Sequence, residues 1–264
     1  MPGTTSTPVR YPSGVTTDLP FQPWGWMGVA NPAFYNLSGD DFNYVLASAT
    51  GPWVATNTGN GTIAATAGDG GLALFTTNSS SPASSDLSSL QRPAACYTPP
   101  TLAQRKRMGF VCRLQCSDMT NAQINIGLIQ TTVTPFTVTD GIYINKAQGS
   151  ATLNLISTVG STPTSTAFPT AAYTLANNTN IDLAWFWDGR SGTLFAYVGY
   201  PLVGPGIQSV GGIGNQDAMV QGPVLSVTGL TLTTANLNPT IALQSGTASS
   251  KTMTVDFAFW AKER

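Results

Sequence analysis

Apolar residues in this chain occur in short runs separated by glycine, asparagine, aspartate and serine. Residues 107–116, "RMGFVCRLQC", alternate with a period of two, which is the pattern of a β-strand with two different faces. One face holds Phe110, Cys112, Leu114 and Cys116, and the other holds Val111, Arg113 and Gln115. The three cysteines of the chain, Cys96, Cys112 and Cys116, are interpreted as reduced small hydrophobes made in a cytoplasm.

Similar runs recur along the chain, and no amphipathic helix of useful length is predicted. The predicted strands are 42–47, 61–67, 71–77, 107–116, 122–132, 141–147, 151–158, 180–187, 192–200, 225–234, 240–246 and 251–261. Many short strands with frequent turn residues predict an all-β fold, a two-sheet antiparallel β-sandwich occupying residues 35–264. Residues 78–94 and 160–172 are predicted to be low-complexity loops, and the Gly-rich stretch 201–223 is a long loop and a second candidate contact region.

Residues 1–34 are predicted to form an extended N-terminal arm, because prolines fix φ and remove backbone donors. The prolines are Pro2, Pro8, Pro12, Pro20, Pro23 and Pro32. Within the arm, "LPFQPWGWMGVANP" carries Phe21, Trp24, Trp26 and Met27, which are too apolar for a free linker. These four residues are candidate interface anchors, and they are expected to dock either on their own domain or on a neighbouring subunit.

The stretch "NIDLAWFWDGRSGTLFAYVGY", residues 180–200, concentrates aromatic side chains around an Asp188-Gly189 turn. Two hypotheses are open for this hairpin: a sugar-binding surface or the core of a sheet. Apart from Asp182, the first strand is apolar on both faces, which favours a strand buried on both sides. Gly189 is predicted to supply the positive φ that a tight turn needs.

Composition excludes several classes of function. Only 9% of the residues are charged and the formal net charge is −1, so no basic face for nucleic acid is expected. No apolar run is long enough to span a membrane, and the first residues lack the features of a signal peptide. Such low charge also fits a protein that sits in an assembly.

The catalytic inventory is short. The chain has no histidine, which argues against Ser-His-Asp catalysis and ordinary zinc sites. The one glutamate is the penultimate residue, Glu263, so the carboxylate pair of a glycoside hydrolase is not found. Asp40 and Asp41 are interpreted as a turn or an Asx cap. No enzyme activity, cofactor or metal is predicted.

Two groups of charged residues have the residue types of a binding site. Arg105, Lys106 and Arg107 lie side by side and are a candidate contact with an acidic partner, although a solvated loop before a strand is favoured. Asp118, Asp140 and Asp188 each lie near a predicted turn. Calcium sites concentrate several acidic oxygens in one short loop, and no segment here does so.

The order of segments resembles concanavalin-A-like (laminin-G-like) jelly-roll domains. The series runs "FVCRLQCSD", "AQINIGLIQTT", "TDGIYINKAQGSATLNLIS", "TLANNTNIDLAWFWDGRSGTLFAYV" and "KTMTVDFAFWAKER". More narrowly, it is similar to the capsid decoration or minor structural proteins of tailed bacteriophages. The glucanase branch of the superfamily carries a glutamate and aspartate cluster on one strand, which this sequence lacks.

The resemblance implies a non-enzymatic virion protein that decorates the outer surface of a capsid. Its partners would be the major capsid protein and neighbouring copies of itself, in a homo-oligomer on the particle. It would be made in the cytoplasm of the host bacterium and located on the capsid exterior. The alternative is a carbohydrate-binding module of a phage tail or fibre that recognises a host surface glycan.

Overall fold

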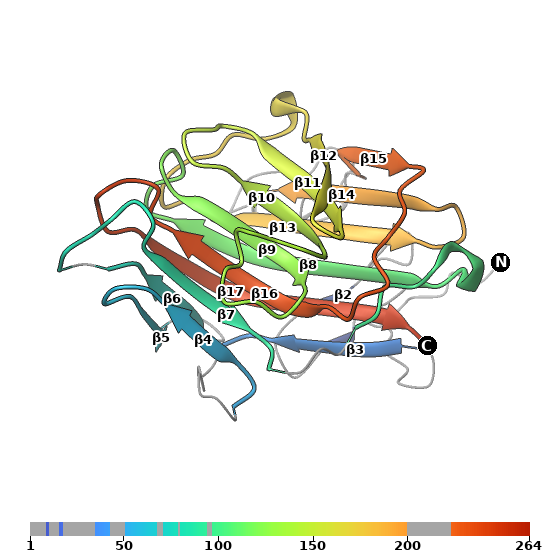
Figure 1. The fold of residues 1–264 in the computed structure, drawn as a ribbon, viewed down its shortest axis with the longest axis horizontal. Coiled ribbons are helices and arrows are strands. Elements are labelled where there is room, and N and C mark those ends of the chain that lie inside the picture. The colour runs from blue at the N-terminus through green and yellow to red at the C-terminus, as the bar shows by residue number, and fades with distance from the viewer. Residues whose placement is uncertain are drawn as a thin grey trace.

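The computed structural model describes residues 9–10, 16–17, 35–42, 51–67, 71–78, 80–93, 97–199 and 223–264. Within these ranges the fold is all-β, with two antiparallel sheets packed face to face and two short 3-10 helices, η1 (Leu102–Gln104) and η2 (Thr170–Ala172) (Figure 1). The predicted two-sheet sandwich is confirmed. None of the described helices has the length and hydropathy needed to cross a membrane.

The first sheet has seven strands. Their spatial order is β12 (Thr162–Ala167), β11 (Leu153–Val159), β10 (Gly141–Lys146), β9 (Gln123–Ile129), β16 (Asn238–Gln244), β7 (Leu87–Gln91) and β4 (Val54–Asn57). Strands β9 to β12 follow one another as a meander, whereas β16 enters between β9 and β7 from far along the sequence.

The second sheet has eight strands. Seven lie in the order β15 (Leu225–Thr228), β14 (Thr193–Gly199), β13 (Ile181–Asp188), β8 (Arg107–Cys116), β17 (Thr252–Glu263), β6 (Leu72–Thr76) and β5 (Thr62–Thr66). The eighth, β3 (Tyr35–Asp40), pairs with the C-terminal half of β17, while β6 pairs with its N-terminal half. The long strand β17 thus joins two short strands end to end.

Residues 1–34 are described only where β1 (Val9–Arg10) and β2 (Thr16–Thr17) pair with each other. The candidate anchors Phe21, Trp24, Trp26 and Met27 lie outside the described residues, as do Cys96 and residues 200–222. The domain boundary at residue 35 therefore stays a prediction.

The core between the sheets follows the predicted alternation. Phe110, Cys112, Leu114 and Cys116 all point into it, as do Trp185 and Trp187 of the aromatic hairpin. Both cysteines are free, and burial raises the pKa of each thiol, which keeps it protonated and unreactive. The interpretation of the hairpin as core is confirmed for this face of β13.

Two predicted loops are wrong. The low-complexity stretch 78–94 contains β7, a fully buried strand of the seven-stranded sheet, and the stretch 160–172 contains β12, an exposed edge strand. Serine-rich sequence gives no hydrophobic alternation, yet Ser88 and Ser89 of β7 donate hydrogen bonds to the carbonyl oxygens of Thr76 and Thr56. These segments form strands because they pair with neighbouring strands, and not because of their own pattern of apolar residues.

The turn of the hairpin also differs from the prediction. The residue with positive φ is Gly192, at +66°, and not Gly189. Gly189 is required for a different reason, because a Cβ there would lie 2.1 Å from the carbonyl oxygen of Lys106. The Asp188 carboxylate accepts hydrogen bonds from the Arg190 amide and the Ser191 hydroxyl, which closes the turn.

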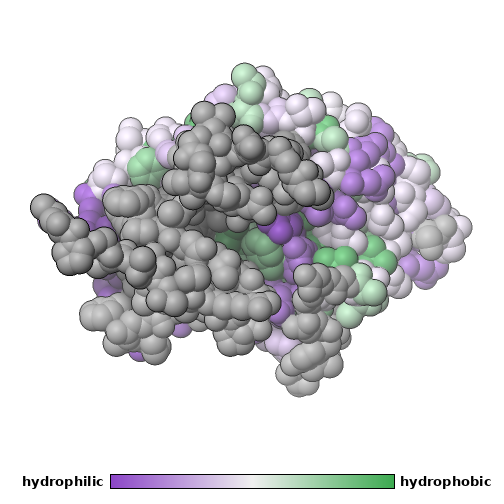
Figure 2. All heavy atoms as spheres, turned by 180° about the vertical axis from the view of Figure 1, so that it is seen from behind, coloured by the Kyte–Doolittle hydropathy of each residue, from purple (hydrophilic) through white to green (hydrophobic). Residues whose placement is uncertain are grey.

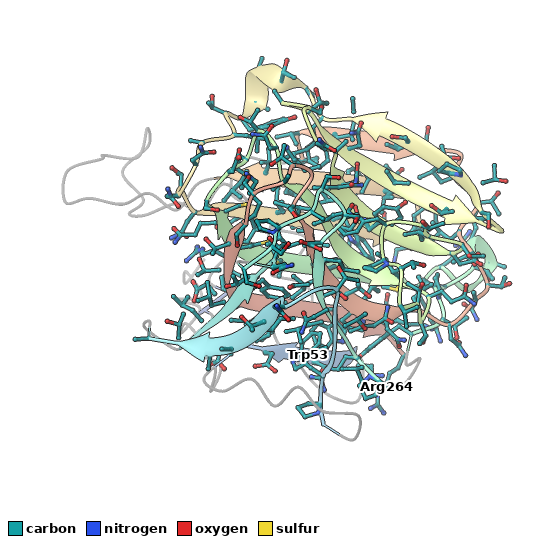
Figure 3. All side chains as sticks on the ribbon, turned by 60° about the vertical axis from the view of Figure 1, so that its left-hand side comes forward. Trp53 and Arg264 are labelled. Atoms are coloured by element: carbon teal, nitrogen blue, oxygen red, sulfur yellow. The ribbon has the colours of Figure 1, made fainter. Side chains whose placement is uncertain are left out.

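An aromatic cluster closes one edge of the sandwich. Trp53 contacts Phe42 and Trp260, and the Arg92 guanidinium lies 5.0 Å from the Trp53 ring and 5.2 Å from the Trp260 ring. The Trp53 indole donates a 2.7 Å hydrogen bond to Asp40, whose other oxygen accepts from the Phe42 amide. The predicted turn role of Asp40 is confirmed. Figure 3 shows Trp53 and Arg264 on the same lower side of the molecule.

Candidate functional site

The outer face of the seven-stranded sheet is rich in carboxamides. Cross-strand pairing places Asn125 opposite Asn145, and Asn145 opposite Asn154, so that three asparagines form a row across β9, β10 and β11. Their neighbours along the strands, such as Ile124, Ile126 and Ile144, point into the core, which assigns the asparagines to the outer side. We call this surface the amide face; it comprises Gln91, Gln123, Asn125, Asn145, Asn154, Asn238 and Gln244.

Three buried members of the amide face hold the loop 130–140 against the sheet. The Gln91 side chain donates to the carbonyl oxygen of Gln130 and accepts from the amide of Thr132. Asn125 donates a 2.7 Å hydrogen bond to the carbonyl oxygen of Pro135, and Asn238 donates one of 2.6 Å to the hydroxyl of Thr131. The loop is therefore held at four of its residues over one part of the amide face.

The other four members are half-buried and reachable: Gln123, Asn145, Asn154 and Gln244. The Asn145 amide donates a 2.6 Å hydrogen bond to the side-chain oxygen of Asn125, which fixes its orientation. Within the described part of the chain, the side chains of Gln123 and Asn154 make no hydrogen bond, so their donors and acceptors are available to a ligand. The adjacent loop adds Val133, which is 70% exposed, and the half-buried Phe136.

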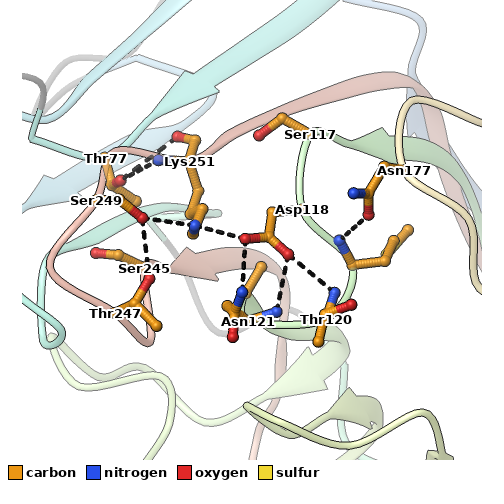
Figure 4. Close-up of polar contacts among 12 residues, drawn as sticks. Thr77, Ser117, Asp118, Thr120, Asn121, Asn177, Ser245, Thr247, Ser249 and Lys251 are labelled. Atoms are coloured by element: carbon orange, nitrogen blue, oxygen red, sulfur yellow. Dashed lines mark hydrogen bonds and ion pairs between the residues drawn. The ribbon is translucent and has the colours of Figure 1, made fainter.

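One end of the amide face is fixed by a charged cluster (Figure 4). Lys251 donates a 2.6 Å hydrogen bond to the Asp118 carboxylate, which also accepts from the backbone amides of Thr120 and Asn121 and from the Asn121 side chain. Burial alone would raise the pKa of Asp118, but the hydrogen bonds from Lys251 and Asn121 outweigh it and hold the pKa well below its usual range.

A second lysine supports the same loop from the inside. The Lys146 ammonium is buried and donates hydrogen bonds of 2.7 and 2.8 Å to the carbonyl oxygens of Thr120 and Ala122. Burial lowers the pKa of Lys146 to about 8, and nearby Cys116 and Asp118 oppose this in part. Because Gln123 directly follows Ala122, and Gln244 precedes the loop that carries Lys251, the two lysines position this end of the amide face.

The three aspartates that lie near predicted turns, Asp118, Asp140 and Asp188, have separate roles. Asp118 pairs with Lys251, Asp140 accepts hydrogen bonds from the Thr233 hydroxyl and the Gly160 amide, and Asp188 closes the hairpin turn. Among the described residues, no three side chains of histidine, cysteine, aspartate or glutamate come together in a metal-binding group. The carboxylates are used as acceptors for backbone and side-chain donors of this chain.

The basic triplet is not a uniform solvated loop. Arg105 is exposed and adopts a left-handed conformation at the end of η1, and Lys106 is half-buried. Arg107, by contrast, is only 9% exposed, and its Nε lies 3.7 Å from the Asp188 carboxylate. Arg107 is the first residue of β8, as the predicted strand 107–116 had it, but its burial beside Asp188 at the end of β13 differs from the solvated side chain that was favoured.

The outer face of the eight-stranded sheet is apolar, whereas the amide face is polar. Val111, Ala184, Phe186, Tyr197 and Ala261 form a second apolar cluster, separate from the core, and Phe195, Phe257 and Phe259 pack against it. Beside this cluster, Arg113 donates two hydrogen bonds to Asp182 and lies 5.2 Å from the Phe257 ring. The alternation in β8 had placed Val111 on this face, but it did not reveal the aromatic neighbours from β13, β14 and β17.

The two-sheet sandwich is similar in fold to several solved lectins. A lectin complexed with galactose, UEA-II, matches with a TM-score of 0.55 and 9% identity, covering 87% of this chain and 99% of that one. Lectin II from Ulex europaeus matches with a TM-score of 0.53 and 8% identity, again over 87% and 99%.

The basic winged bean lectin, solved with Tn-antigen, matches with a TM-score of 0.52 and 5% identity over 87% of this chain and 99% of that chain. At these identities the likeness concerns the fold alone. Neither a protein-family model nor a curated protein matches the sequence.

Proposed function

We propose that this chain is a non-enzymatic binding module that recognises a neutral carbohydrate through the amide face. The observation that carries the proposal is the set of four reachable carboxamides, Gln123, Asn145, Asn154 and Gln244, beside an anchored loop. A carboxamide both donates and accepts hydrogen bonds, as a sugar hydroxyl does, and it carries no charge. The face therefore suits an uncharged polyhydroxylated ligand.

The sheet provides the rigidity that such recognition needs. Asn145 is oriented by Asn125, which is itself held by its bond to Pro135, so ligand binding would order few side chains. Val133 and Phe136 on the loop add apolar surface next to the amides, which is the usual composition of a small-molecule site. The lectin-like neighbours support the same class of ligand by their fold.

The test is a screen of the full chain against immobilised neutral and acidic glycans, followed by calorimetric titration of the best neutral ligand. Asn145→Ala and Asn154→Ala should each weaken binding by about tenfold, because each removes a ligand hydrogen bond from a preorganised site. Asn180→Ala is the matched control, since Asn180 is exposed and precedes β13 in the other sheet. Absence of glycan binding at millimolar concentration, or binding that both variants retain, would rule the proposal out.

A second candidate is a structural protein of a tailed-phage virion that decorates the capsid exterior by contacts with the major capsid protein and with copies of itself. The aromatic outer face of the eight-stranded sheet favours it, because surfaces of this composition are usually covered by protein. The number of copies of this chain relative to the major shell protein in purified particles tests it. Hundreds of copies would support decoration, and a handful would favour the tail or fibre.

A further inference from the structure

The outer face of the eight-stranded sheet carries an apolar surface that an ordinary two-layer sandwich would leave in water. We call it the aromatic face and define it by Val111, Phe186, Phe195, Tyr197, Phe257 and Phe259. Strand pairing arranges these residues in rows: Phe259 lies opposite Val111, and Phe186 lies opposite Phe195. Figure 2, which shows the molecule from behind, has hydrophobic surface near the middle of that side.

The aromatic face is shielded from solvent at its centre and half-buried around it. Phe186 and Tyr197 are each 2% exposed and Val111 is 5% exposed, although all three point away from the core. Phe195, Phe257 and Phe259 remain half-buried. Within the described ranges, the strands form only the two sheets of the sandwich and the short β1–β2 pair, and the half-buried rings of Phe195, Phe257 and Phe259 leave apolar surface for a covering segment.

The path of the chain brings the N-terminal arm to the edge of the aromatic face. β3 begins at Tyr35 and pairs with β17 along the edge of the aromatic face, so residues 1–34 enter the fold at this edge. Gly39 lies opposite Phe259, and a Cβ at Gly39 would lie 2.0 Å from the Phe259 ring, so that ring rests against β3. The glycine therefore lets the Phe259 ring lie against β3, the strand that directly follows the N-terminal arm.

The length and the composition of the N-terminal arm also suit it to cover the aromatic face. Trp26 precedes Tyr35 by nine residues, which span roughly 30 Å when extended. The distance across the sheet from β3 to β13 is three strand spacings, or about 14 Å, so the arm is long enough to cross it. The arm carries Phe21, Trp24, Trp26 and Met27, and its prolines prevent it from folding as a helix. An extended apolar segment on a flat aromatic surface buries large rings without a second folded core.

We propose that the N-terminal arm, residues 1–34, docks in cis on the aromatic face and covers it as a third layer, with Trp24 and Trp26 as the principal anchors. The proposal is independent of the glycan-binding function, because the amide face lies on the opposite sheet. It removes the aromatic face from the surface of the free protein. A partner that needed this face would have to displace the arm.

Photo-cross-linking of the full chain tests the proposal. Trp24 is replaced by p-benzoylphenylalanine, equal amounts of isotopically light and heavy chain are mixed, and cross-linked peptides are identified by mass spectrometry. We expect cross-links to peptides of β13, β14 or β17 that contain Phe195, Phe257 or Phe259, within single isotopic chains. The same photoreactive residue at Leu102, whose side chain is 59% exposed, serves as the control and should not label the aromatic face.

Each other outcome overturns the proposal. Mixed light–heavy products would show that a second copy covers the face, and cross-links elsewhere, or none to the face, would show that the arm does not. An independent measurement uses the full-length double variant with Trp24→Ser and Trp26→Ser, which should bind the dye anilinonaphthalene sulfonate several-fold more strongly than the wild type. Adding Phe257→Ser should reduce that gain, and an unchanged dye signal in the double variant would contradict docking.

Discussion

The Nζ atom of Lys251 lies 2.6 Å from Oδ2 of Asp118, although 133 positions separate the two residues in the sequence. This pair joins the loop after β8 to the loop before β17. Lys251 is also bound to the Ser249 hydroxyl, and its backbone amide donates to the Thr77 hydroxyl, so three loops meet at one lysine. The end of the sandwich that presents Gln123 and Gln244 is held by this junction.

Replacing Asp118 by Asn should lower the free energy of unfolding by about 1–3 kcal/mol at pH 7, because it leaves a largely buried ammonium without its carboxylate. The folded-state pKa of Asp118 is lowered below its ordinary value of 3.8. Its stabilising contribution is therefore present above that pH and is lost as the pH falls through the folded-state pKa. Urea unfolding of wild type and variant at pH 7 and pH 2.5 should show a difference that shrinks in acid, and a constant difference would contradict this account.

Lys146 should make stability rise with pH on the alkaline side. Its folded-state pKa is about 8 against an ordinary value of 10.5, so between these values the unfolded chain binds more protons than the folded one. The free energy of unfolding of the wild type, relative to that of Lys146→Met, should increase from pH 8 to pH 10. Chemical unfolding across this range measures the difference directly. Parallel pH dependence of the two proteins would show that Lys146 does not titrate in this window.

Gly246 should tolerate no side chain. Its φ is +70°, and a Cβ there would lie 2.0 Å from the carbonyl oxygen of Asn121, where the two loops of the charged cluster touch. Gly149 is the matched control, because its φ is +68° but no atom lies within 4 Å of the added Cβ. Thermal unfolding should show a loss of about 1 kcal/mol for Gly149→Ala and about 3 kcal/mol or more for Gly246→Ala. Equal losses would mean that backbone strain alone explains both.

Trp53→Phe should destabilise the fold by about 1–3 kcal/mol, because it removes the hydrogen bond to Asp40 and weakens the contact with Arg92 in a buried corner. Phe75→Leu, a core change of similar size without a polar contact, is the comparison. A double-mutant cycle with Asp40→Ala isolates the bond by chemical unfolding. A coupling energy near zero would show that the Trp53 indole and Asp40 act independently.

The predictions from sequence succeeded where one strand carries its own hydrophobic signal. The bounds of β8 were predicted in full, and β13 was identified as buried on both faces from its run of apolar residues. The low-complexity stretches gave the opposite result, because β7 and β12 are made of serine, threonine and proline as much as of apolar residues. β7 and β12 become strands because they form hydrogen bonds with neighbouring strands, and the local sequence does not show which strands those are.

For the charged residues too, local contacts were predicted from the sequence and long-range contacts were not. Asp40 was interpreted correctly as a turn residue, since an Asx turn is a local hydrogen bond to the amide two residues on. The partner of Asp118 was not found, because Lys251 reaches it only after β17 has paired with β8. Arg107 begins the predicted strand 107–116, but the sequence did not reveal its burial, because the ion pair with Asp188 depends on the register between β8 and β13.

By itself, the sequence determined the all-β class, the alternation within the strongest strands and the low content of charged residues. Only the tertiary structure decided that Asn125, Asn145 and Asn154 form one row, that the outer face of the other sheet is aromatic, and that β3 enters at its edge. The physical reason is that a period of two tells which side chains share a face of one strand. Which strands become neighbours is fixed by long-range pairing across the whole chain, and both candidate surfaces exist only at that level.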